Sequence, residues 1–250
     1  MAYIYYNYII KRLKNKVKYD KMSKKYRIKE GIIMQGKDII LFDLDGTITD
    51  SKKGIFASIR YALNYFGIKD SPEEKLQKFL GPPLVQAFME HYGMSEEDAD
   101  IALVKYREFY SAEGVFMLSM YKGFDDVIKT LKENGFTTAL ATSKPLFYAE
   151  KIVERIGIKP YFDYLCGATM DKTMNEKADI IKYTIEKNNY DKNRILMVGD
   201  RNHDIKGAIS NNVTPLGVLY GYGSKDELEK AGCRIYAETM DDLKRILIKK

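Results

Sequence analysis

Two periodic patterns divide the chain. In residues 37–51, and again from about residue 121 onward, short apolar runs alternate with stretches in which apolar residues recur at helical spacing. Short apolar runs are typical of strands buried on both faces of a parallel sheet, and their alternation with helices is typical of a doubly wound α/β fold. Residues 52–117 show helical spacing only. The pattern therefore predicts an α/β core with a doubly wound parallel sheet, interrupted by a small all-helical cap domain.

The core pattern predicts parallel strands joined by right-handed helical crossovers. Strands are expected at residues 39–42, 136–142, 164–166, 194–199 and 215–220. Helices are expected at about 124–134, 145–156, 176–187 and 204–210, with one more that opens at Ser224.

The insertion has its own helix signals. Apolar residues recur at helical spacing from Ile55 to Phe66, and Ser71 with Pro72 indicates the start of a second helix with Ser71 as the N-cap. Residues 81–83, Gly-Pro-Pro, break that helix, and Ser95 caps the start of another. Because the insertion begins directly after the first strand and its turn, it is placed to act as a lid over that turn.

The basic charge of the chain is confined to its first residues. The net charge is +6, but residues 1–33 carry ten Lys or Arg against two acidic residues, which leaves residues 34–250 nearly neutral. We expect residues 1–33 to be a basic extension, either a non-native or disordered leader ahead of Met34 or a surface-binding helix. The expected domains are then a core of 34–51 and 118–250 and a cap of 52–117. Neither nucleic acid nor a membrane is an expected partner.

The first strand ends in two carboxylates. Asp43 follows four large apolar residues directly, and Asp45 and Gly46 come next. An Asp-Gly pair alone is an ordinary turn signal. However, a carboxylate at the end of a buried strand is costly unless something binds it, and ligands bind at the carboxyl ends of strands in open α/β sheets. We therefore expect a ligand or a metal ion at this turn.

Two other strands end in polar groups. Thr142, Ser143 and Lys144 follow the second strand, where the hydroxyls could bind a phosphate at a helix start or simply cap that helix. Asp200 and Asp204 follow the strand at 194–199. Acids from two neighbouring strand ends could share one hard divalent cation such as Mg²⁺. Lys144 itself could reach a substrate or extend into solvent.

These residues together resemble a known family. Asp43–Thr47 is similar to the first motif of the haloacid dehalogenase-like phosphohydrolases, Thr142 to the second, Lys177 to the third, and Gly199-Asp200 with Asp204 to the fourth. Finer similarity points to the branch of phosphoglycolate phosphatases and 5'-nucleotidases. It is carried by residues 80–84, 141–145, 199–204 and 217–223.

The resemblance implies a mechanism and a cofactor. It implies that Asp43 is the nucleophile and forms an aspartyl-phosphate, and that Asp45 is the general acid and base. It implies Mg²⁺ as the cofactor, held by the carboxylates of Asp43 and Asp200 and by the main-chain carbonyl of Asp45.

The remaining motif residues are given supporting roles by the same resemblance. Thr142, Lys177 and the amides around Leu44 and Ser143 would hold the phosphoryl oxygens. Asp204 would not touch the metal itself but would orient Lys177 or the water molecules around the metal.

Several functions remain open at this point. The expected function is hydrolysis of a small phosphorylated metabolite, such as a nucleoside 5'-monophosphate or phosphoglycolate. A sugar phosphomutase and a non-catalytic phosphometabolite-binding protein are the alternatives.

The aromatic residues of the cap could stack on a base or fill a helical core: Phe56, Tyr61, Tyr65, Phe79, Phe88 and Tyr92. Two cysteines without zinc-like spacing, Cys166 and Cys233, fit a cytoplasmic protein. The oligomeric state is left open.

Overall fold

The computed structural model describes residues 35–171 and 173–248, and the expectations for residues 1–33 lie outside this part of the chain. Its centre is a six-stranded sheet in which every neighbouring pair is parallel, in the order β5-β4-β1-β6-β7-β8. The strands are β1 (Ile39–Phe42), β4 (Thr137–Pro145), β5 (Tyr164–Ala168), β6 (Ile195–Gly199), β7 (Thr214–Val218) and β8 (Tyr236–Ala237). The predicted α/β fold with a parallel sheet is thereby confirmed.

The first strand, β1, lies in the middle of the sheet and is buried on both faces. Its residues alternate between two cores: Ile40 and Phe42 pack into one, whereas Ile39 and Leu41 pack into the other. This is the two-sided burial that a continuous apolar run predicts. The end of β1 is therefore held rigidly between its neighbours β4 and β6.

Helices cover both faces of the sheet and make three layers. Residues of α6, α7 and α11 share the core of Phe42, and residues of α8 and α9 share the core of Leu41. These helices are α6 (Phe124–Glu133), α7 (Leu146–Arg155), α8 (Lys177–Asn188), α9 (Asn202–Ser210) and α11 (Met240–Ile248), and α10 (Lys225–Lys230) packs on α9.

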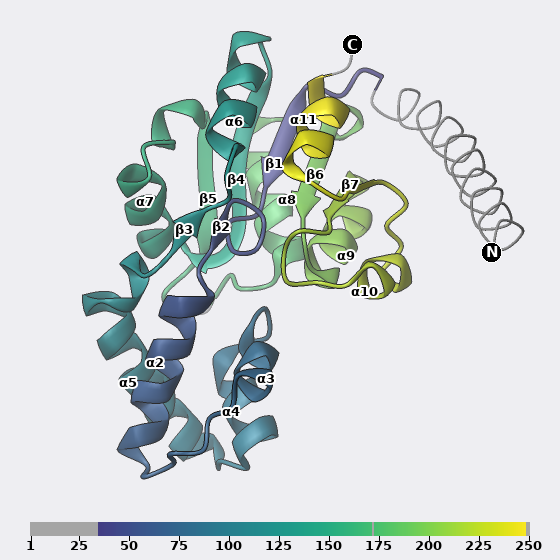
Figure 1. The fold of residues 1–250 in the computed structure, drawn as a ribbon. Helices are drawn as coiled ribbons and strands as arrows, with labels where there is room; N and C mark the ends of the chain where they lie inside the picture. Colours follow the sequence, from purple (N-terminus) through teal and green to yellow (C-terminus); the bar gives the residue numbers. More distant parts are fainter. Residues whose placement is uncertain (1–34, 172, 249–250) are drawn as a thin grey trace, which may run out of the picture.

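The helical insertion (residues 52–117) is grouped at one end of the sheet (Figure 1). Its helices are α2 (Lys52–Tyr65), α3 (Glu73–Leu76), α4 (Leu84–Tyr92) and α5 (Glu96–Ala112). A short antiparallel pair, β2 (Thr49–Asp50) with β3 (Ser119–Met120), joins the entry and exit of the insertion to the sheet domain. None of the described helices combines the length and the apolar composition that crossing a lipid bilayer requires.

Some local expectations need correction. Ser71 does not cap α3: Pro72 is the N-cap residue, and no side chain accepts a hydrogen bond there. Helix α4 was not predicted, although Pro83 before it and Gly93 after it, at φ 66°, are ordinary boundary signals. By contrast, Ser95 and Ser224 cap their helices as predicted, each accepting from a backbone amide three residues on.

Candidate active site

The strand register places the candidate residues at one edge of the sheet. Phe42, the last residue of β1, lies beside Leu140 of β4 and Val198 of β6. Asp43 directly follows Phe42. Thr142 lies two residues after Leu140, and Asp200 lies two residues after Val198. The carboxyl ends of three adjacent strands therefore converge, as the sequence pattern predicts.

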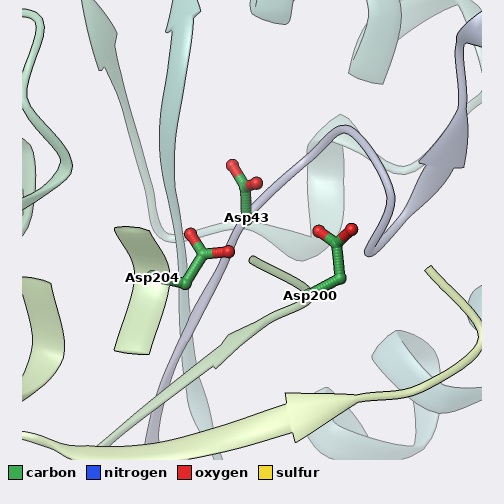
Figure 2. Close-up of side chains that lie close together, drawn as sticks. All are labelled: Asp43, Asp200 and Asp204. Atoms are coloured by element: carbon green, nitrogen blue, oxygen red, sulfur yellow. The ribbon is translucent and has the colours of Figure 1, made fainter. Parts of the chain in front are cut away.

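Three carboxylates meet at this edge. Asp43, Asp200 and Asp204 can each offer an oxygen so that the three atoms lie within 4.8 Å of one another. Figure 2 shows their side chains around a common space, with Asp43 from the end of β1, Asp200 from the loop after β6 and Asp204 from the start of α9. All three are buried, and Asp200 is fully shielded from solvent.

Like charges buried together are held at an electrostatic cost. Burial raises the pKa of Asp200 well above its usual value, and the charges of Asp204 and Asp43 raise it further. Burial likewise raises the pKa of Asp204 to about 6, although Lys177 opposes this shift. A cation placed among these carboxylates would relieve their repulsion.

The donor set fits a hard divalent cation. All three groups are carboxylates, and oxygen is the ligand atom that such ions prefer. Asp200 is aimed into this space by Tyr222, whose amide donates to Oδ2 at 2.7 Å, and by Thr47, whose hydroxyl donates to Oδ1 at 3.2 Å. A Cβ on Gly46, which has φ +84°, would lie 2.2 Å from Oδ2 of Asp200. The turn after β1 therefore needs a glycine both for its conformation and for this close approach.

Lys177 is the buried cation of the site. Its ammonium lies 2.6 Å from Oδ1 of Asp43 and 2.9 Å from Oδ1 of Asp204, and it donates to the carbonyl oxygen of Ala141 at 3.0 Å. Burial lowers its pKa, but the attraction of Asp204 and Asp43 outweighs burial and raises the pKa above its usual value. Lys177 therefore forms ion pairs with both Asp43 and Asp204.

Asp45 points away from the carboxylate cluster. Its Oδ2 lies 2.8 Å from the ammonium of Lys144, and its Oδ1 accepts from the hydroxyl of Ser51. Ser51 is in turn held by Tyr222, whose hydroxyl accepts from the Ser51 amide at 2.9 Å. The two aspartates of the first turn therefore have separate partners, and the side chain of Asp45 lies outside the cluster.

The polar residues at the end of β4 do not cap the next helix. Pro145 is the N-cap residue of α7, and no side chain bonds there. Thr142 is buried and its hydroxyl accepts from the amide of Lys144 at 3.2 Å, while Ser143 is exposed. Capping therefore does not explain these hydroxyls, and both residues line the cavity described next.

A cavity of about 210 Å³ opens over Asp43. Its floor is made by the candidate residues Asp43, Asp45, Thr142, Ser143, Lys177 and Asp204. Its other wall comes from the helical insertion, mainly from Phe79, Leu80, Leu103, Tyr106, Arg107 and Tyr110. The candidate site therefore lies between the sheet and the insertion.

Three polar contacts hold this wall in place. The hydroxyl of Tyr110 accepts from the ammonium of Lys144 at 2.7 Å, and the hydroxyls of Ser111 and Tyr148 lie 2.6 Å apart. The guanidinium of Arg201 donates to the carbonyl oxygen of Leu80 and is itself fixed by Glu227. Lys144 does not extend into solvent: it lines the cavity, paired with Asp45, so a contact with the substrate stays a prediction.

The sequence analysis did not single out the tyrosines of the cavity. Of the six aromatics considered from the sequence, Phe79 alone lines this cavity, whereas Phe56 and Phe88 fill the core of the insertion and Tyr61 and Tyr65 are exposed. The cavity instead contains Tyr106, Tyr110, Tyr148 and Tyr222. Leu103, Tyr106 and Tyr110 of α5 recur at helical spacing, but core packing produces the same pattern, so the sequence could not single them out.

A family model described as haloacid dehalogenase-like hydrolase matches residues 40–218. The chain belongs to the haloacid dehalogenase-like hydrolases. This confirms the family resemblance found from the sequence. The matched span starts inside β1 and ends with β7, so it includes the predicted site residues Asp43, Asp45, Thr142, Ser143, Lys177, Asp200 and Asp204.

Relatives of this hydrolase carry more than one name. A 5'-nucleotidase of Pseudomonas aeruginosa is 36% identical over 83% of this chain and 94% of its own length. The tyrosine-protein kinase PtkA of Mycobacterium tuberculosis is 34% identical over 85% of this chain and 73% of its own length. Proteins named phosphoglycolate phosphatase are 26% and 28% identical.

A solved structure shows the same fold. The crystal structure of a predicted phosphatase from Clostridium acetobutylicum has a TM-score of 0.80 and 40% identity, and it covers 84% of this chain and 97% of its own. Similarity to proteins named 5'-nucleotidase and phosphoglycolate phosphatase agrees with the branch expected from the sequence.

Proposed function

We propose that this hydrolase is a Mg²⁺-dependent phosphatase that cleaves the phosphomonoester of a small metabolite through an aspartyl-phosphate on Asp43. One observation carries the proposal. The buried carboxylates of Asp43, Asp200 and Asp204 surround one space beside Lys177, while the second acid, Asp45, faces the same cavity with different partners. The nucleophile Asp43 and the cation site thus lie close together, and the general acid and base, Asp45, has its own position beside them.

The first step is transfer of the phosphoryl group to the protein. A carboxylate oxygen of Asp43 attacks phosphorus, the bond from phosphorus to the ester oxygen breaks, and Asp45 gives a proton to the leaving oxygen. Lys177, 2.6 Å from Asp43, and the hydroxyl of Thr142 would bind the phosphoryl oxygens. The amide and hydroxyl of Ser143 would complete this phosphate-binding set.

The second step releases phosphate. Asp45 takes a proton from water as the water oxygen attacks phosphorus, and the bond from phosphorus to Asp43 breaks. Asp45 ends this step with the proton that the next leaving group needs, so one residue serves both steps. Ser51 and Lys144 hold the Asp45 carboxylate in place for this role.

Asp43, Asp200 and the main-chain carbonyl of Asp45 would hold the Mg²⁺. Bound there, the ion would reduce the repulsion between an anionic carboxylate and an anionic phosphate. Asp204 contacts Lys177 directly, so we propose that it positions this lysine and does not bind the metal itself.

The domain division remains part of this proposal. Residues 34–51 and 118–250 would form the core, and residues 52–117 would form a cap that excludes water when it closes on the bound substrate. Its wall over the cavity, with Tyr110 joined to Lys144, supports this role. We take the substrate to be a nucleoside 5'-monophosphate or phosphoglycolate, following the names of the relatives.

Release of phosphate tests the proposal against its alternatives. The intact protein should release phosphate from some members of a panel of phosphomonoesters when Mg²⁺ is present, and EDTA or the Asp43→Asn substitution should abolish release. A sugar phosphomutase would instead isomerise a sugar phosphate, and a sensor would bind ligand without turnover. Either outcome would overturn the assignment as a phosphatase.

A further inference from the structure

Arg107 lies where two cavities meet. Beside the cavity over Asp43 there is a second one of about 240 Å³, and both are lined by Leu84, Leu103 and Arg107. The second cavity shares Ser143 and Lys177 with the first but has none of its three aspartates, and it reaches Val85 of the insertion and Glu176 of the core. A group attached to a phosphate at Asp43 can therefore extend along Arg107 into the second cavity.

The position of Arg107 follows from the geometry of α5. Leu103, Tyr106, Arg107 and Tyr110 share one helix face because they are three or four residues apart. Tyr110 contacts Lys144, which pairs with Asp45, and Arg107 precedes Tyr110 by three residues, about 4.5 Å along the helix axis. Arg107 thus lies on the same helix face as Tyr110 and lines the cavity over Asp43 as well as the second cavity.

The guanidinium of Arg107 is available for such a contact. Within the described part of the chain it forms no ion pair, and its one hydrogen bond is long, 3.5 Å from Nη2 to the carbonyl oxygen of Met170. The other cations of the first cavity are already paired: Lys177 with Asp43, Lys144 with Asp45, and Arg201 with Glu227. A guanidinium has a planar set of donors that matches a planar oxygen acceptor.

We propose that Arg107 is a specificity-determining residue that binds the leaving group of the substrate through a planar oxygen acceptor, either a carboxylate or a nucleobase carbonyl. The apolar side chains of Leu84 and Leu103 pack beside the same group. This inference rests on the proposed phosphatase function, because it takes the phosphoryl group to be held at Asp43.

Matched pairs of substrates test the proposal. Phosphoglycolate and ethyl phosphate differ by a carboxylate, and uridine 5'-monophosphate and ribose 5-phosphate differ by the base. Arg107→Met should lower kcat/KM for the acceptor-bearing member of one pair by about 10- to 100-fold, the size expected when a charge-assisted hydrogen bond is lost. The value of kcat/KM for the other member of that pair should be unchanged. The affected pair identifies which acceptor is bound.

Two companion variants separate specificity from structure. Arg107→Lys keeps the charge but not the planar donors, so it should recover only part of the selectivity. Lys105→Met removes a cation on the same helix that lines neither cavity and pairs with Glu108, so it should leave both pairs unchanged. Equal losses for both members of each pair, or no loss at all, would overturn the proposal.

A binding measurement keeps this test separate from the proposed activity. The same four compounds can be titrated by calorimetry into Asp43→Asn protein with and without Arg107→Met. Weaker binding of one acceptor-bearing compound alone supports the role of Arg107 even if the intact protein releases no phosphate, and in that case only the phosphatase proposal fails. Unchanged binding of all four compounds overturns the inference about Arg107.

Discussion

Lys144 joins the helical insertion to the second aspartate of the site. Its ammonium lies 2.7 Å from the hydroxyl of Tyr110 and 2.8 Å from Oδ2 of Asp45. Burial lowers the pKa of Lys144, but the charge of Asp45 and the neighbouring tyrosines outweigh burial and raise it above its usual value. Tyr110 of the insertion thus holds the ammonium of Lys144, which in turn contacts Asp45, the proposed general acid and base.

Removing the Tyr110 hydroxyl should impair catalysis in a way that depends on the leaving group. Tyr110→Phe keeps the ring but removes one partner of Lys144, so we expect Asp45 to be held less firmly. The value of kcat should fall by about 10-fold for ethyl phosphate, which needs a proton on its leaving oxygen. It should fall less for p-nitrophenyl phosphate, whose leaving group needs none. Equal losses on both compounds would contradict this account.

Tyr92 offers a matched control within the insertion. Its hydroxyl is buried and has no hydrogen-bond partner among residues 35–171 and 173–248. Tyr92→Phe should therefore leave the activity unchanged and raise the free energy of unfolding by about 1 kcal/mol, because the cost of burying an unpaired polar group disappears. Urea unfolding followed by circular dichroism measures this change. A destabilised variant would show that the hydroxyl has a partner in solution.

The turn after β1 should tolerate no side chain at Gly46. In Gly46→Ala the new Cβ would meet Oδ2 of Asp200 at 2.2 Å and displace that carboxylate. We expect both Mg²⁺ binding and activity to be lost. Gly67→Ala is the matched control, since Gly67 also has positive φ, +71°, but no atom lies within 4 Å of an added Cβ. If both variants lose the same activity, backbone strain and not the contact with Asp200 is responsible.

The strand ends were the most predictable part of the site. Buried apolar runs that stop at Asp43 and Asp200 predicted both the sheet edge and the convergence there, because parallel strands end on the same side. The pairing of Lys144 with Asp45 and Tyr110 could not be predicted, since it depends on how the insertion packs on the sheet. Helix α4 was missed for a similar reason: it is short, and only Ala87 and Phe88 are buried in it.

The acidic cluster should make the metal-free protein less stable as pH rises. Burial raises the pKa of Asp204 to about 6 in the folded state, against about 3.9 in an unfolded chain. Between these values the unfolded chain loses its proton first, so the free energy of unfolding falls from about pH 4 to about pH 6 and then stays lower. Asp204→Asn should lack this part of the decrease when both proteins are unfolded with urea in EDTA. If the free energy of unfolding depended on pH in the same way in both proteins, the raised pKa of Asp204 would be contradicted.

Mg²⁺ should reverse that loss of stability at neutral pH. An ion that binds only the folded protein raises the melting temperature by mass action. We expect the increase in the intact protein to be larger than in Asp200→Asn, which has one carboxylate fewer. Sodium chloride at matched ionic strength is the control for screening. An equal increase with both salts would argue against a cation site at this cluster.

The central claim is that Asp43 carries the phosphoryl group. The most direct test is mass spectrometry of the peptide that contains Asp43, after the protein has been mixed with substrate and Mg²⁺ and quenched in acid. We expect a phosphoryl group on Asp43. With a substrate whose leaving group needs no proton, Asp45→Asn should carry more of it, because this variant still forms the intermediate but hydrolyses it slowly. Phosphate release with no modified Asp43 peptide in either protein would contradict the account.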